Sequence, residues 1–140
     1  MSKEANPIPQ GNYVPATRCG NLIFTAGMTP RKQGVLILTG SVKADDDLGK
    51  YRDAVRQAAG NALTAARNKL EEGERIARLL TITVYINAED GFVKHAALAD
   101  FASGYFLEEL GESGIAAKAA IGVKTLPGNA PCEIQITAMA

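Results

Sequence analysis

Several residue types are scarce in this 140-residue chain, and each scarcity excludes a class of function. The single histidine, His95, rules out a histidine-based metal centre and the HExxH zinc motif. A Ser-His-Asp triad would have to use His95, and the chain has no nucleophile elbow to go with it. Neither GxGxxG nor GxxxxGKS/T occurs, so no nucleotide-phosphate motif is present. Catalysis, if any, must come from carboxylates, lysines, tyrosines, backbone amides and water.

Net charge, aromatic residues and long apolar runs are also scarce or absent. Lysine and arginine together balance aspartate and glutamate, so the formal net charge is zero and no electrostatic footprint for nucleic acid is visible. Tryptophan is absent, which disfavours a base-stacking surface. No apolar run reaches the roughly 18 residues of a membrane span, and residues 1–12 lack the apolar region of a secretory signal. Cys19 and Cys132 have no CxxC spacing, as expected for a reduced cytoplasmic protein.

The apolar pattern predicts one α+β domain over residues 13–140, preceded by a polar, proline-rich and flexible lead-in over residues 1–12. The expected elements are strands over 14–18, 22–26 and 35–38, a helix over 48–73, a strand over 75–87, a helix over 92–110, and strands over 117–123 and 132–139. This order predicts two layers, with two helices on one face of a six-stranded mixed sheet.

Two of these strands have informative faces. The strand over 75–87 carries β-forming residues on both faces, so we expect both to be covered, one by the helices and the other by a second subunit. Its predicted faces are Leu80, Ile82, Val84 and Ile86 on one side, and Leu79, Thr81, Thr83 and Tyr85 on the other. The strand over 132–139 alternates, and its apolar face consists of Cys132, Ile134, Ile136 and Ala138.

The closing strands place two charges on an apolar background, and we interpret them as the floor of a small-molecule site. Lys118 interrupts a small apolar strand, and Glu133 lies near the start of the next one. A cation can anchor the carboxylate of a small acid, and a nearby glutamate can position or deprotonate a water. A solvated edge-strand lysine and an exposed strand glutamate are the alternative readings.

Two residues nearer the start of the chain complete the candidate site. Tyr13 can cover the site or donate a hydrogen bond, with plain packing as the alternative. Gly27 can let a ligand approach the backbone, with a bulge or a simple turn as the alternative.

Four blocks of sequence resemble the RidA family, the reactive intermediate deaminases formerly called YjgF. The blocks are GNYV at 11–14, GNLIFTAG at 20–27, KAAIGVKTLP at 118–127 and CEIQI at 132–136, and the predicted order of elements also matches. The long second helix and the turn over 111–114 resemble a subgroup with an extended second helix. The resemblance implies the chorismate-mutase-like RidA fold, a homotrimer whose sheets line an inner barrel, and sites in the clefts between subunits.

The resemblance also implies an activity and the residues that carry it out. The activity is the hydrolysis, without a cofactor, of enamines and imines such as 2-aminoacrylate to a keto acid and ammonia, as in a 2-iminobutanoate/2-iminopropanoate deaminase. The family's carboxylate-binding arginine matches Lys118, its frequent cysteine matches Ala120, and its water-positioning glutamate matches Glu133. Its site tyrosine and glycine match Tyr13 and Gly27.

The lysine at residue 118 is the main departure from the family's pattern. Arginine holds a carboxylate through two parallel hydrogen bonds, whereas lysine offers a point charge on a flexible stem. The change either weakens the binding of imino acids by ~1–2 kcal/mol or marks a member that has lost this reaction.

Three functions therefore stay open: a deaminase-like hydrolase, a non-catalytic trimer that binds a small carboxylate or keto acid as a sensor or pathway accessory, and a ribonuclease or translation inhibitor. Zero net charge argues against the third. No cofactor, metal, nucleic acid or membrane is expected.

Overall fold

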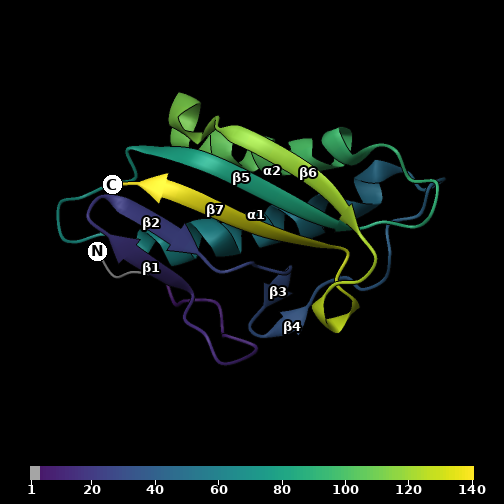
Figure 1. Cartoon of the computed structure of the whole chain (residues 1–140), viewed down its shortest axis with the longest axis horizontal. Helices are drawn as coiled ribbons and strands as arrows, with labels where there is room; N and C mark the ends of the chain where they lie inside the picture. Colours follow the sequence, from purple (N-terminus) through teal and green to yellow (C-terminus); the bar gives the residue numbers. More distant parts are fainter. Residues whose placement is uncertain (1–3) are drawn as a thin grey trace.

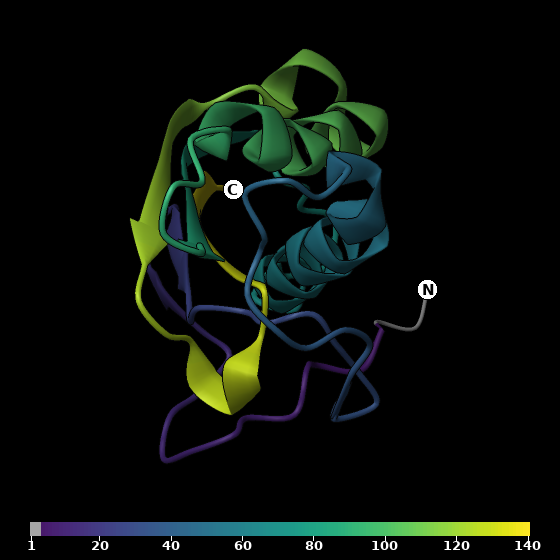
Figure 2. The same ribbon diagram turned by 90° about the vertical axis from the view of Figure 1, so that its right-hand side faces the viewer.

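The computed structural model describes residues 4–140, which form a sheet with two helices packed across one of its faces (Figures 1 and 2). Residues 1–3 of the predicted lead-in lie outside the described residues. The strands and helices are β1 (Ala16–Cys19), β2 (Leu22–Thr25), β3 (Arg31–Lys32), β4 (Val35–Leu36), α1 (Arg52–Arg67), β5 (Arg78–Asn87), α2 (His95–Leu110), β6 (Ala117–Val123) and β7 (Cys132–Met139). The predicted α+β architecture, with two helices and a mixed sheet, is confirmed.

The main sheet has the strand order β1-β2-β7-β5-β6, and only β5 and β6 run parallel to each other. A parallel pair needs a long crossover, and α2 provides it. The sheet contains five strands rather than the six expected, because β4 pairs with β3 in a separate hairpin. Gln33 and Gly34, both with positive φ, form the two-residue turn that joins these short segments.

The two helices bury alanine-rich faces against the sheet. Ala58, Ala59, Ala62 and Ala66 of α1 are fully buried, and small side chains let the helix approach the sheet closely. Helix α1 ends at Arg67 rather than near Gly73, and residues 68–70 continue only as a turn.

Helix α2 begins at His95 rather than at Phe92. The Phe92 ring is nevertheless buried and packs edge-on against the His95 ring, with 5.0 Å between the ring centroids. His95 therefore has a packing role at the start of the helix.

The buried face of β5 differs from the prediction at the start of the strand. Leu79 is buried and Leu80 is only half-buried, because a β-bulge between Leu79 and Thr81 shifts the alternation. From Ile82 onward the prediction is confirmed, as it is for β7. The buried residues of β5 and β7 that face the helices are Ile82, Val84, Ile86, Cys132, Ile134, Ile136 and Ala138.

Within residues 4–140, no helix covers the opposite side of the sheet, called the open face below (Figure 2). It carries Leu22 and Phe24 of β2, Thr83 and Tyr85 of β5, Ala119 and Ile121 of β6, and Glu133 and Gln135 of β7. Phe24 and Ile121 are each 43% exposed, so apolar area on this face remains in contact with solvent. None of the helices within residues 4–140 is long and apolar enough to cross a membrane.

Candidate functional site

Glu133 is the best-defined candidate on the open face. It lies between the buried residues Cys132 and Ile134 of β7, so the alternation of the strand turns its side chain away from the helices. The carboxylate lies against Gly27: a Cβ built at residue 27 would lie 2.3 Å from Glu133 Oε2 and 2.8 Å from its Cδ. Residue 27 therefore leaves room for this carboxylate only as a glycine.

Backbone pairing explains why Gly27 is held at that place. The Met28 N–H donates to the Ile134 carbonyl at 2.7 Å, and the Ile134 N–H donates to the Met28 carbonyl at 2.8 Å. This isolated bridge fixes the segment after β2 against β7, next to Glu133. The space into which a Cβ of residue 27 would project is thus filled by a side chain of the same chain.

The surroundings of Glu133 favour its protonated form. Burial raises the pKa of the carboxyl group above its usual value, and nothing else shifts it, because no cation or hydrogen-bond donor within residues 4–140 compensates. Tyr85 lies directly across from Glu133 on β5, and Ile121 follows on β6. A carboxylate with a raised pKa on a mainly uncharged surface is suited to accepting a proton from water near neutral pH.

Lys118 lies on the other side of the sheet. In the strand register it shares a row with Ile82 and Ile136, which face the helices. Its Nζ donates to Asp100 Oδ1 at 2.7 Å and to Ser103 Oγ at 2.7 Å, both on α2. Lys118 and Glu133 therefore do not meet within one chain.

Ala120 lies two residues after Lys118 on the same helix-facing side of β6 and is half-buried. A site that uses both Lys118 and Glu133 would need two copies of the chain. The position of β6 at the edge of the sheet, with β5 as its single neighbour, leaves one side of the strand open to such a copy.

Asp100 and Ser103 were not among the candidates from the sequence. They are three residues apart, which places them on one face of a helix, and that spacing was readable in advance. What the sequence did not show is that this face of α2 meets Lys118, because that depends on how the crossover packs.

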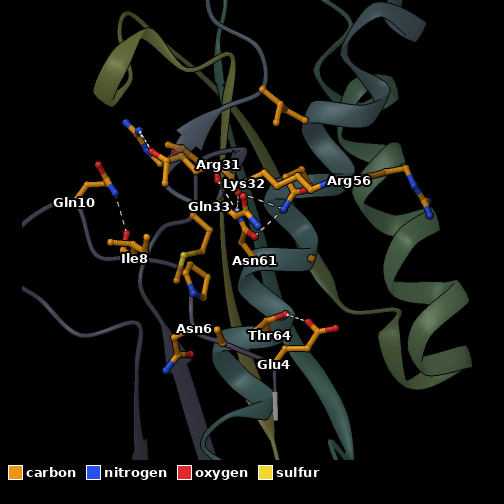
Figure 3. A pocket seen from close by; sticks show the side chains of 18 of the residues that line it. Glu4, Asn6, Ile8, Gln10, Arg31, Lys32, Gln33, Arg56, Asn61 and Thr64 are labelled. Atoms are coloured by element: carbon orange, nitrogen blue, oxygen red, sulfur yellow. Dashed lines mark hydrogen bonds between the residues drawn. The ribbon is translucent and has the colours of Figure 1, made fainter. Parts of the chain in front are cut away.

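A groove of about 790 Å³ lies between the N-terminal segment, the loop over 27–34 and α1 (Figure 3). Tyr13 and Gly27 line it, whereas Lys118, Ala120 and Glu133 do not. The Tyr13 hydroxyl accepts a hydrogen bond from the Gln10 N–H at 2.9 Å. The groove therefore joins two of the five predicted site residues, and the Glu133 carboxylate, which lies against Gly27, is not among its lining groups.

Several polar groups lining this groove already have partners in the same chain (Figure 3). The Asn61 amide donates to the Arg31 carbonyl at 2.8 Å, and the Thr64 hydroxyl donates to Glu4 Oε2 at 3.0 Å. These contacts hold the N-terminal segment and the loop against α1. Within residues 4–140 no three His, Cys, Asp or Glu side chains gather closely enough to bind a metal ion.

Comparison with known proteins agrees with this fold. A family described as "YjgF/chorismate_mutase-like, putative endoribonuclease" matches residues 4–139. The crystal structure of Atu1372 from Agrobacterium tumefaciens, a protein of unknown function, is 31% identical with a TM-score of 0.86, and the match covers 97% of this chain and 86% of that chain.

Two further relatives are similar over most of their length. A "putative endoribonuclease" from Shewanella oneidensis is 26% identical with a TM-score of 0.89, covering 100% of this chain and 93% of that chain. Protein TCP17 of Trypanosoma cruzi is 27% identical over 127 residues, which are 90% of this chain and 79% of that protein. Sequence blocks, fold and relatives agree, and the chain belongs to the YjgF/RidA-like family.

Proposed function

We propose that this protein hydrolyses small imines or enamines to a carbonyl compound and ammonia, at sites built from two copies of the chain. The observation that carries the proposal is the Glu133 carboxylate, which is half-buried, seated on Gly27 and without a hydrogen-bond donor among residues 4–140. Such a group is free to bind and deprotonate a water.

The reaction needs one water and no redox partner. Glu133 takes a proton from water as the water oxygen bonds to the carbon of the C=N group. The nitrogen takes up this proton and then the proton of the new hydroxyl group, and it leaves as ammonia when the C–N bond breaks and the C=O bond forms. An enamine enters the same sequence after protonation at carbon.

The second copy of the chain is part of the proposal. Lys118 faces away from Glu133 in one chain, so it would contribute to the site of a neighbouring copy. The partly apolar open face supports such an assembly, because Phe24 and Ile121 remain exposed in the isolated chain. A homotrimer, as in the resemblance, would cover this face.

The relatives' endoribonuclease label suggests a second candidate function. Zero net charge and the absence of tryptophan weigh against an RNA-binding surface. A non-catalytic trimer that binds a small metabolite is the other candidate, and it would share the cleft but not the chemistry.

The test measures the disappearance of free imine, and the imine that remains is detected by trapping it with semicarbazide. Flavin-dependent oxidases release 2-iminopentanoate from 2-aminopentanoate and butanimine from butylamine. The wild-type protein should accelerate the loss of at least one imine, and Glu133→Gln should abolish the acceleration. Glu112→Gln, the same change at an exposed turn, should leave it intact. Equal imine lifetimes with and without wild-type protein would refute the proposal, and cleavage of RNA would favour the second candidate.

A further inference from the structure

The cation expected to hold a substrate carboxylate already has an anionic partner. Lys118 Nζ is 2.7 Å from Asp100 Oδ1 and 2.7 Å from Ser103 Oγ. We propose that the site therefore acts on uncharged imines, derived from aldehydes and ketones, in preference to 2-imino acids. This inference rests on the proposed function and names its substrate class.

The first argument is the number of donors. An ammonium group has three N–H bonds, and two of those on Lys118 are used within the chain. A single remaining N–H can hold one acceptor, whereas arginine offers a carboxylate two parallel bonds. The Ser103 hydroxyl accepts from Lys118, and its own proton stays available for a neutral oxygen or nitrogen.

The second argument is charge. The Asp100 side chain is 70% exposed and the Lys118 side chain only 20%, so the anion of the pair is the member that solvent reaches most easily. A substrate carboxylate approaching Lys118 from solvent would meet the negative charge of Asp100. Among residues 4–140, Asp100 pairs with no cation other than Lys118, so no second positive charge offsets this repulsion.

The third argument is competition. Asp100 belongs to the same chain and stays next to Lys118 at a high effective concentration. A dissolved carboxylate must displace it or bind beside it, and a neutral imine has to do neither. The two like charges, about 4 Å apart in water, would lower the rate with a carboxylate substrate about fivefold relative to the same site without the Asp100 charge.

The experiment compares two imines that differ by one carboxylate, 2-iminopentanoate and butanimine, in the trapping assay above. We expect the wild-type kcat/KM to be higher for butanimine than for 2-iminopentanoate. Asp100→Asn keeps the shape and the hydrogen bond but removes the charge, and it should shift the ratio about fivefold toward 2-iminopentanoate. Glu108→Gln, which neutralises another paired carboxylate of α2, should leave the ratio unchanged.

The outcomes separate this inference from the proposed function. A wild-type kcat/KM that is higher for 2-iminopentanoate than for butanimine, or a ratio that Asp100→Asn leaves unchanged, would overturn the inference and leave imine hydrolysis standing. If the wild-type protein hydrolyses neither imine faster than the Glu133→Gln variant does, the proposed function and the inference both fail. Asp100→Ala provides a second variant, which should shift the ratio in the same direction.

Discussion

The Glu133 carboxylate fills the space that a side chain at residue 27 would need, since Oε2 lies 2.3 Å from the position of a Cβ there. Gly27→Ala should push the carboxylate out of its seat and lower kcat/KM at least tenfold for any imine the protein hydrolyses. The displaced atoms end a flexible side chain, so the free energy of unfolding should fall by less than about 1.5 kcal/mol. In a Glu133→Gln background the same change should have little further effect on the rate.

Gly104→Ala is the matched control for that prediction. A Cβ at residue 104 meets no atom within 4 Å, and the residue lies inside α2. The variant should keep its rate and gain up to about 1 kcal/mol of stability from its better helix propensity. A Gly27→Ala variant with a wild-type rate would show that the position of the carboxylate does not matter.

The raised pKa of Glu133 predicts two opposite pH dependences. The proposed reaction requires the ionised carboxylate, so kcat/KM should fall about tenfold per pH unit below the raised pKa, at a pH above the ordinary glutamate range. Stability has the opposite sign, because burial disfavours the ionised form in the folded state. The carboxyl group destabilises the fold at neutral pH. This effect disappears as the pH falls below the pKa that the carboxyl group has in the unfolded chain.

Glu133→Gln should accordingly melt at a higher temperature than wild type at neutral pH. The difference should shrink as the pH falls through the raised pKa toward about 4, where both side chains are neutral. Thermal unfolding by circular dichroism across this range checks the prediction, and a difference that grows on acidification would contradict it.

An ion pair far from the site gives the reverse pattern. Arg18 donates to Glu74 through two bonds of 2.6 and 2.8 Å, which tie β1 to the loop after α1. The Arg18 guanidinium, helped by the Glu71 N–H, lowers the pKa of Glu74 from 4.5 to about 2. The pair therefore stabilises the fold above pH 4.5 and is lost as the pH falls toward about 2.

Glu74→Gln should lower the melting temperature at neutral pH. The difference in melting temperature between this variant and the wild type should narrow as the pH falls from 4.5 to the lowest pH at which both proteins fold. Glu72→Gln, an exposed neighbour with no ion pair within the described chain, should show no such convergence. A constant difference for Glu74→Gln at all pH values would mean that the charge is not the cause.

The open face predicts the state of assembly. Phe24→Asp places a charge at an apolar position that a neighbouring copy would cover, and it should convert the proposed trimer into smaller species. Val35→Asp changes a more exposed apolar residue on the separate β3–β4 hairpin and should leave the mass unchanged. Light scattering coupled to size exclusion measures the molar mass of both variants. A wild-type protein that is monomeric would contradict the proposal that the site is built from two copies of the chain.

The alternation of apolar and polar residues was enough to predict the buried face of the last strand. The period of two in residues 132–139 identifies the buried face of β7, because no bulge interrupts it. In β5 the same reasoning fails at Leu79 and Leu80, since a bulge adds a residue that the composition of the strand does not reveal. The hairpin of β3 and β4 was missed because the partner with which a strand pairs depends on the tertiary structure.

The candidate site shows the same division. Glu133 and Gly27 were both selected from the sequence, and their contact depends on the Met28–Ile134 bridge, which joins segments more than a hundred residues apart. The side on which Lys118 lies could not be predicted, because one residue of register reverses the faces of a strand.

The edge position of β6 has a consequence for redesign. Lys118 and Ala120 belong to a strand with one neighbour, whereas Glu133 belongs to a strand that has partners on both sides. The groups proposed to set ligand preference therefore lie on an edge strand, and the carboxylate proposed to carry the hydrolysis lies on a central strand. Library selection at residues 100, 103, 118 and 120 can vary what the protein accepts while the central strands, and the carboxylate they carry, keep their geometry.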